Sequence, residues 1–139
     1  MAGIRGTDTR PELTLRRGLH AAGLRYRLHA KGLPGRPDLV LPRHRAAIFV
    51  HGCFWHRHEG CHWCSTPATR PEFWAAKFAR NVERDERNAE LLLDDGWRVA
   101  IVWECALKVD RQATIDAVAD WVRSGAPRFE TGLPRPRQP

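Results

Sequence analysis

The sequence lacks any long hydrophobic run. Among its 139 residues, no stretch has the length and apolarity of a membrane span, and residues 1–10 lack the apolar core of a signal peptide. We therefore expect a cytoplasmic protein with no membrane partner. The chain also shows no internal repeat, and its length predicts a single domain.

Lysine is scarce, although the chain is strongly basic. Lys and Arg together number 23 against 16 Asp and Glu, which gives a net charge of +7, yet the lysines are only Lys31, Lys77 and Lys108. The other basic residues are arginines, whose forked guanidinium suits phosphates and guanine edges. This balance favours nucleic acid as a partner but does not by itself establish one.

Apolar periodicity and chain breakers predict an α/β domain. Thr9 and Glu12 fit a capping box that opens a helix, and Gly23 ends it. Two later helices are expected over residues 71–95 and 111–124. Short strands are expected over residues 26–28, 38–41, 46–50 and 98–103.

Strands that lie between an opening helix and two later helices predict a mixed central sheet flanked by helices. Residues 1–125 form the predicted domain. Residues 126–139 are rich in Pro and Arg and are expected to form a disordered tail.

Residues 51–64 are dense in metal-binding side chains, since seven of these fourteen residues are His or Cys. In a reducing compartment such cysteines indicate a metal site or core packing rather than disulfides. Zinc takes four nitrogen or sulfur ligands, with local ligands a few residues apart. Cys53, His58 and Cys61 meet that spacing, and His62 and Cys64 are alternatives.

The fourth ligand is expected to be Cys105, which follows the predicted strand over residues 98–103. It reaches the site if that strand neighbours the strand over residues 46–50; without these partners, a buried core thiol would be the better interpretation. Three cysteines and one histidine leave no open coordination position. The zinc is therefore expected to be structural rather than catalytic.

The long predicted helix carries an acid on its apolar face. Helical spacing places Asp85 on one stripe with Phe78, Val82, Ala89 and Leu92. A carboxylate there must be paired or suffer a large desolvation cost. His51 is the candidate partner. A salt bridge to Arg84 or Arg87, or a rotated helix that exposes Asp85, are the alternatives.

Asp38 follows a loop rich in Gly and Pro and opens a predicted strand. Hydrolysis of a phosphodiester needs a hard cation, and Mg²⁺ takes oxygen ligands from few protein groups. Asp38 can supply one ligand, and a backbone carbonyl at the end of the next strand another. A turn or cap aspartate is the alternative interpretation.

Five motifs together resemble the very-short-patch repair (Vsr) DNA mismatch endonucleases. They are GRPD at residues 35–38, HGCFWHRH at 51–58, NVERD at 81–85, GWRV at 96–99 and VWEC at 102–105. The resemblance runs in order from about residue 1 to residue 107. It implies a restriction-endonuclease-like core with one structural zinc.

The resemblance also implies a function. Family members nick double-stranded DNA 5′ of the thymine in a T·G mismatch, which starts repair where 5-methylcytosine has deaminated. We therefore expect a Mg²⁺-dependent endonuclease that associates with the nucleoid through DNA. Functional links to a cytosine-5 DNA methyltransferase and to mismatch-repair proteins are implied as well.

Site roles follow from the resemblance position by position. Asp38 matches a Mg²⁺ ligand, and Val50 matches a residue whose main-chain carbonyl binds the same ion. Val50 stands where a well-studied member has threonine, so only the carbonyl is retained. His56 matches the histidine that activates the attacking water.

Further roles concern the neighbouring acids and the zinc. His51 and Asp85 match a histidine–aspartate pair at the active centre, and Glu12 matches an acid near it, although the sequence alone reads Glu12 as a capping residue. The residues that match zinc ligands are Cys53, His58, Cys61 and Cys105. Because the loop after His58 is one residue longer here, Cys64 stays an alternative to Cys61.

Several apolar residues match groups that intercalate between bases. Phe54, Trp55 and Trp74 match such residues beside the mismatch; a hydrophobic cap over the zinc site is the alternative. Members often carry a longer N-terminal arm that inserts apolar groups from the opposite groove. Here only Met1 and Ile4 could serve, so weaker clamping of DNA, or a wrongly assigned start codon, is expected.

Three other functions remain open from the sequence. One is a nuclease of the same fold with a different mismatch or site preference. Another is a non-catalytic zinc module that binds DNA, and the last is a hydrolase that uses zinc itself. Cleavage sensitive to EDTA would exclude the second, and a count of thiolate ligands on the metal would test the third.

Overall fold

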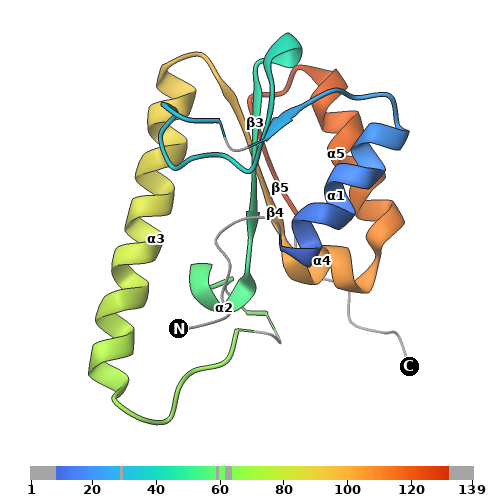
Figure 1. The fold of residues 1–139 in the computed structure, drawn as a ribbon. Helices are drawn as coiled ribbons and strands as arrows, with labels where there is room; N and C mark the ends of the chain where they lie inside the picture. The colour runs from blue at the N-terminus through green and yellow to red at the C-terminus, as the bar shows by residue number, and fades with distance from the viewer. Residues whose placement is uncertain (1–8, 29, 59, 62–63, 132–139) are drawn as a thin grey trace.

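The computed structural model describes residues 9–28, 30–58, 60–61 and 64–131. A central sheet separates one long helix from three others, with α3 on one face and α1, α4 and α5 on the other (Figure 1). The elements are α1 Arg10–Ala21, β1 Arg27–Leu28, β2 Leu39–Leu41, the 3-10 helix η1 Pro42–His44, β3 Ala46–His51, α2 Cys53–His56, α3 Pro71–Asp94, β4 Arg98–Trp103, α4 Glu104–Val109, α5 Arg111–Ser124 and β5 Arg128–Glu130.

The sheet is mixed, as predicted. Its order is β1-β2-β3-β4-β5; the first three strands pair antiparallel, and β3, β4 and β5 run parallel. The parallel register pairs Val50 with Val102 and His51 with Trp103. The carboxyl ends of β3 and β4 therefore meet at the same edge, and the segments that follow them are neighbours.

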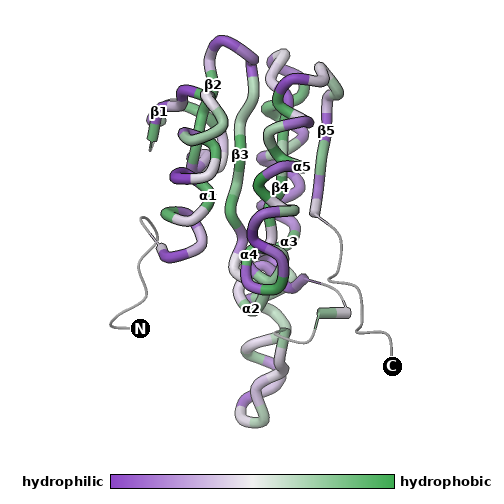
Figure 2. The backbone as a smooth tube through the Cα atoms, turned by 90° about the vertical axis from the view of Figure 1, so that its right-hand side faces the viewer, coloured by the Kyte–Doolittle hydropathy of each residue, from purple (hydrophilic) through white to green (hydrophobic). Residues whose placement is uncertain are grey.

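Apolar side chains cover both faces of the central strands. One core lies between the sheet and the α1/α5 layer and includes Ile48 and Val102; the other lies on the α3 face and includes Ala47 and Val99. Figure 2 shows β3 as a largely hydrophobic strand within the fold. Strands buried on both faces read as continuous apolar runs, which is why residues 46–50 and 98–103 were recognisable from sequence.

The start of α1 follows the predicted cap. The Oγ1 atom of Thr9 accepts a hydrogen bond from the backbone N–H of Glu12 at 3.4 Å, and Thr9 also donates to the Glu12 carboxylate at 3.3 Å. The helix ends at Ala21, and Gly23 has a φ of +89°. Only 2% of Glu12 is exposed, so this capping acid is buried beneath the sheet edge.

Besides the short 3-10 helix η1, three elements were not predicted: α2, α4 and β5. The two helices have four and six residues, too few to show a period. The prediction of a disordered tail from residue 126 was wrong for residues 126–131. There β5 pairs with β4, and Thr131 donates its backbone N–H to the carbonyl of Ile101. The remainder of that tail, and Met1 and Ile4, lie outside the described residues.

Within the described part of the chain, the structure contains no helix that is both long and apolar enough to cross a membrane.

Candidate active site and metal cluster

A cluster of thiols and one imidazole lies where β3 and β4 end. Cys53 opens α2 directly after β3, and Cys105 lies at the start of α4 directly after β4. The donor atoms of these residues, His58 and Cys61 all lie within 4.8 Å of one another, and all four residues are buried. The predicted set thus comes together, and it includes Cys61 rather than Cys64; His62 lies outside the described residues.

The donor spacing fits a metal ion. A tetrahedral site with ordinary metal–sulfur and metal–nitrogen bonds places sulfur about 3.6 Å from nitrogen. His58 Nδ1 lies 3.3 Å from Cys105 Sγ and 3.8 Å from Cys53 Sγ. Burial raises the pKa of the Cys53 thiol, and it raises the pKa of Cys105 to about 11. Thiolates here need a cation, so this cluster could hold a metal.

The Trp-Glu-Cys motif explains how β4 supports the cluster. The ring of Trp103 stacks on His58, with centroids 4.2 Å apart and planes at 8°. Glu104 Oε1 accepts the backbone N–H of Cys53 at 3.0 Å, which fixes the first residue of α2. Cys105 then supplies its sulfur. Each residue of the motif therefore touches the loop that follows β3.

A second group combines two histidines with the acid on α3. His56 Nδ1 lies 2.6 Å from Asp85 Oδ2, and the His51 ring stacks on the His56 ring at 3.8 Å and 6°. The prediction that Asp85 pairs with a histidine was right, but the choice of His51 as its direct partner was wrong. The unpredicted turn of α2 carries His56 to α3, while His51 stays in β3.

The alternatives for Asp85 are also settled by geometry. Arg84 donates to Asn81, and Arg87 pairs with Glu83. The helix stripe is only partly buried, since Val82 is 45% exposed and the Asp85 side chain 21%. Asp85 therefore faces a half-open space rather than the core.

Electrostatics distinguish the two histidines. Burial lowers the pKa of His51 to about 3; the neighbouring His56 also lowers that pKa, and Asp85 opposes both. His51 is therefore neutral at pH 7. His56 points Nδ1 at a carboxylate, so Nδ1 is the position that carries its proton when Asp85 is ionised, and Nε2 keeps a lone pair.

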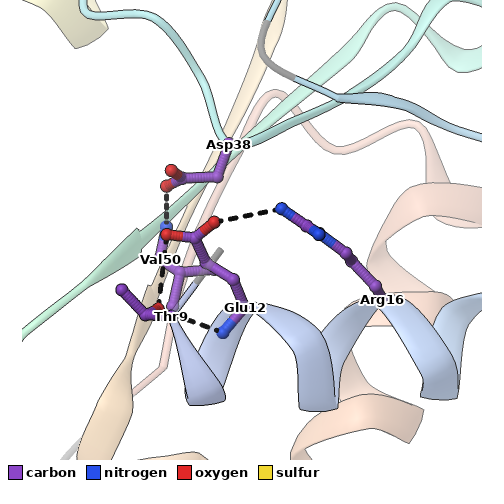
Figure 3. Close-up of polar contacts among 5 residues, drawn as sticks. All are labelled: Thr9, Glu12, Arg16, Asp38 and Val50. Atoms are coloured by element: carbon purple, nitrogen blue, oxygen red, sulfur yellow. Dashed lines mark hydrogen bonds and ion pairs between the residues drawn. The ribbon is translucent and has the colours of Figure 1, made fainter. Parts of the chain in front are cut away.

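Asp38 lies one residue before β2. Its Oδ2 accepts the backbone N–H of Val50 at 2.7 Å (Figure 3). The N–H and C=O of one strand residue point to the same edge, so the Val50 carbonyl lies on the side of Asp38. This arrangement gathers oxygen atoms at the end of β3.

Glu12 reaches the same place from α1, as Figure 3 shows, and Arg16 donates to its carboxylate at 3.3 Å. Burial raises the pKa of Asp38 to about 7; the Val50 hydrogen bond lowers that pKa, and the charge of Glu12 raises it. A cation near the Asp38 carboxylate would favour its ionised form. The capping residue read from sequence is thus also the second acid beside Asp38, as the family resemblance implied.

Gly35 allows the loop before Asp38 to close on the fold. Its φ is +75°, and an added Cβ would lie 3.0 Å from Asn88 Cβ and 3.0 Å from Phe49 Cε1. A side chain there would push the loop away from α3 and β3. Asp38 is also fixed by its own backbone N–H, which donates to Ile48 at 2.9 Å.

One cleft of about 1030 Å³ joins these groups. Its lining includes the functional candidates Asp38, Val50, His51, His56 and Asp85. Basic side chains of Lys31, Arg36 and Arg84 line it as well. Phosphate contacts from such residues position nucleic acids.

Aromatic side chains gather on α2 and on the first turns of α3. Ring centroids of Phe54 and Trp55 lie 4.9 Å apart, and each lies within 6.3 Å of Trp74. All three are half-buried, and the neighbouring Phe73 is 44% exposed. The ammonium group of Lys77 lies 5.8 Å from the Trp55 ring and 5.9 Å from the Trp74 ring. The cluster packs against itself yet keeps accessible ring surface beside a cation.

Comparison with known proteins supports a nuclease. The family model described as DNA mismatch endonuclease Vsr matches residues 1–63. The chain is 45% identical over 126 residues to the DNA mismatch endonuclease Vsr of Escherichia coli (strain K12), which covers 88% of this chain and 80% of that protein. The chain belongs to the Vsr family of DNA mismatch endonucleases. It is therefore a DNA endonuclease.

Other similarities agree with the Vsr assignment. The chain is 49% identical over 107 residues to the type II nicking enzyme V.XorIIP of Xanthomonas oryzae pv. oryzae, across 77% of this chain and 78% of that one. In structure, it resembles the catalytic domain of the homing endonuclease I-Bth0305I, with a TM-score of 0.55 and 20% identity over 83% of this chain and 96% of that one. This likeness shows that the two chains share a fold, and the mixed sheet flanked by helices confirms the predicted α/β core.

The sequence did not indicate which residues support the site residues through contacts. Trp103 ends the strand predicted over residues 98–103 and is buried, but its stacking on His58 gave no sequence signal beyond the motif itself. Glu130 accepts the Trp103 indole N–H at 2.9 Å from β5, a strand the sequence did not predict. Such supporting contacts depend on tertiary structure.

Proposed function

We propose that this Vsr-family protein nicks duplex DNA on the 5′ side of the thymine in a T·G mismatch, with Mg²⁺ as its catalytic metal. The observation that carries the proposal is that the His56–Asp85 pair and the Asp38–Val50 group line one cleft. A proton acceptor and an oxygen-rich cation site in one cleft are what metal-assisted hydrolysis of a phosphodiester needs.

The Asp38 carboxylate and the Val50 carbonyl would hold Mg²⁺, and Glu12 lies behind Asp38. When bound, Mg²⁺ supplies neutralisation of the phosphate and of the charge that develops as the bond breaks. The hydrogen bond from the Val50 N–H holds one oxygen of Asp38 at 2.7 Å, so the carboxylate is oriented before any ion binds. The residues present fit Mg²⁺, which takes hard oxygen ligands and needs few of them from the protein.

His56 would accept the proton of the attacking water at Nε2. Asp85 holds the opposite nitrogen and stabilises the imidazolium that forms, as in other histidine–carboxylate pairs. His51 supports the His56 ring by stacking. Because His51 is neutral at pH 7, it would serve as a neutral hydrogen-bond donor to the phosphate or the leaving oxygen rather than as a cation.

The Cys53, His58, Cys61 and Cys105 cluster would hold structural zinc. All four donors come from the protein, which leaves no position for water or substrate. The ion would fix α2, and α2 carries His56 into the cleft. This role separates the metal that stabilises the fold from the metal that takes part in the reaction.

Phe54, Trp55 and Trp74 would stack between base steps beside the mismatch. Unstacking costs a few kcal/mol and costs less at a mismatch, so such wedges contribute to selectivity. The half-exposed rings and the nearby Lys77 suit that contact. Lys31, Arg36 and Arg84 in the cleft would bind the backbone phosphates.

The proposed substrate implies a cellular setting. A T·G mismatch arises where 5-methylcytosine deaminates, so the protein would act in the cytoplasm, on the nucleoid, where a cytosine-5 methyltransferase modifies the DNA. Mismatch-repair proteins would then use the nick.

The test is nicking of end-labelled duplexes that carry T·G, other mismatches or a fully paired site, with Mg²⁺ or with EDTA. We expect Mg²⁺-dependent cleavage 5′ of the mismatched thymine. Asp38→Asn should abolish cleavage while binding persists, and Asp94→Asn, at an exposed acid late in α3, should cut normally. Equal cleavage of the paired duplex, or an active Asp38→Asn variant, would refute the proposal. Cleavage at a different mismatch would assign another preference to the same nuclease.

A further inference from the structure

His51, His56 and Asp85 form a three-donor group that is separate from the thiol cluster. One potential ligand atom from each of them lies within 4.8 Å of the others. Two imidazoles and one carboxylate are the donors of the facial triads that bind transition metals. We propose that these three residues bind a second metal ion of the Co²⁺, Ni²⁺ or Zn²⁺ class, and that this ion switches off the proton-accepting role of His56. The inhibitory part rests on the proposed function.

The local geometry favours such an ion. His56 Nδ1 and Asp85 Oδ2 are 2.6 Å apart, and neighbouring ligands around one ion are about 2.9 Å apart or more, so these atoms need to separate only slightly to share an ion. The His51 ring lies parallel to the His56 ring at 3.8 Å, so a shared ion requires one ring to tilt about its side-chain torsion. The side chains of His56 and Asp85 are 26% and 21% exposed to the cleft, so an ion has access and the rings have space to turn.

Donor chemistry separates this site from the proposed Mg²⁺ site. Imidazole suits Co²⁺, Ni²⁺ and Zn²⁺, whereas Mg²⁺ takes oxygen ligands. Asp38 and the Val50 carbonyl offer oxygen alone. The same cleft therefore holds a hard site and a borderline site side by side. As a borderline metal is added, the imidazole site should fill first, and saturating Mg²⁺ should keep the oxygen site occupied.

Binding would move a proton within His56. The ion takes Nδ1 and the Asp85 carboxylate, and the proton that His56 carried on Nδ1 passes to Nε2, so the imidazole stays neutral. With Nδ1 bound to metal and Nε2 protonated, His56 has no lone pair left to accept a proton from water. Nicking should fall as the site fills.

Cobalt titration of the zinc-loaded protein tests the site without reference to activity. Protein that carries one equivalent of zinc is titrated with Co²⁺, and metal stoichiometry and the visible spectrum are recorded. We expect one additional equivalent, with ligand-field bands of a nitrogen/oxygen site. If no additional equivalent binds, or if its spectrum shows thiolate-to-cobalt charge transfer, the proposal is overturned.

Variants assign the ligands. His51→Gln and Asp85→Asn should each weaken Co²⁺ binding by at least about tenfold, since even loss of an outer-shell partner weakens metal binding by that factor. Unchanged zinc content in each variant would show that the fold is intact. His20→Gln removes an exposed histidine on α1 and should bind Co²⁺ as the parent does. Equal Co²⁺ affinity in all three variants would overturn the assignment.

The nicking assay then tests the regulatory part at saturating Mg²⁺. The rate should fall over the Co²⁺ range that fills the second site, equally in the parent and in His20→Gln. An unchanged rate with the site filled would overturn the inhibitory role. Protein that binds the second equivalent yet never nicks DNA would refute the proposed function and leave the metal site standing.

Discussion

The thiol cluster and the His56–Asp85 pair use the same short helix, α2, in opposite ways. Around His58, the donors face one another and are at most 8% exposed. Around His56, the side chains of the histidine and of Asp85 are 26% and 21% exposed and face the cleft. A ligand set that closes on itself contributes stability, whereas an open pair can meet a substrate. Burial, more than residue type, separates the role of His58 from that of the His56–Asp85 pair.

Trp103 connects the two regions. Its ring stacks on His58 at 4.2 Å and meets the edge of His51 at 5.2 Å. Because Trp103 ends β4 and pairs with His51 in the sheet, one rigid strand supports both groups. The buried cluster can therefore position the open one without entering the chemistry.

The largest expected effect concerns the closed cluster. Cys105→Ser replaces a buried thiolate donor, and structural zinc contributes on the order of 10 kcal/mol to the folding of small metal-dependent domains. We expect the metal content to fall and the free energy of unfolding to drop by several kcal/mol, measured by metal analysis and denaturant titration. Cys64→Ser, which alters a cysteine outside the cluster, should keep the metal content and the free energy of unfolding of the parent. A stable, metal-loaded Cys105→Ser protein would contradict the comparison.

Substitutions in the His56–Asp85 pair should have the reverse effect, a loss of nicking with little change in stability. His56→Gln and Asp85→Asn should lower the single-turnover nicking rate about 10²- to 10⁴-fold, because each removes part of one proton acceptor. Metal content and melting temperature should stay near those of the parent. Since the two residues act as a unit, the double variant should be little slower than the slower single variant. Glu83→Gln, at an exposed position on α3, the helix of Asp85, is the control. If the rate losses of the two single variants multiply in the double variant, the two residues do not act as a unit.

The stability of the zinc-loaded protein without Mg²⁺ should depend on the charge of Asp38. Burial raises the pKa of Asp38 from 3.8 to about 7, so the folded protein favours the protonated carboxyl. This contribution is complete below about pH 4 and is lost as the pH rises through 7, by roughly 1–4 kcal/mol. Asp38→Asn should remove the loss and be more stable than the parent at pH 8. Added Mg²⁺ should stabilise the parent alone at that pH.

Denaturant titrations from pH 5 to 8 measure this effect as the difference between parent and Asp38→Asn. The difference is needed because His51 acts in the opposite sense. Burial lowers the pKa of His51 to about 3, so its contribution is present above the ordinary value of 6.5 and is lost as the pH falls toward 3. A parent-minus-variant difference that does not change with pH would contradict the burial of an ionisable Asp38.

Much of the fold was predictable because the central strands are buried on both faces. Residues 46–50 and 98–103 form apolar runs, and the spacing of the cysteines and histidines indicated one metal site before their neighbours in space were known. By contrast, α2, α4 and β5 are too short to carry a periodic pattern.

The wrong or missing predictions at the site follow from the elements that the sequence did not reveal. Without α2, the strand residue His51 was the natural partner for Asp85, yet one helical turn places His56 there instead. Without β5, nothing indicated that Glu130 supports Trp103. Glu12 shows a different limit, because a capping pattern is local and cannot reveal that the same carboxylate is buried beside Asp38.

The smallest expected effect tests whether the two regions are coupled. Trp103→Phe keeps a ring against His58 and His51 but removes the indole N–H that Glu130 accepts at 2.9 Å. Loss of one such hydrogen bond costs about 1 kcal/mol, and Glu130→Gln, which retains an acceptor oxygen, should cost less. If Trp103 positions both groups, Trp103→Phe should lower metal affinity and slow nicking together, each by less than about tenfold. Competition with a chelator and single-turnover nicking measure the two. A change in metal affinity with an unaltered nicking rate would mean that the closed cluster stabilises the fold without positioning the open pair.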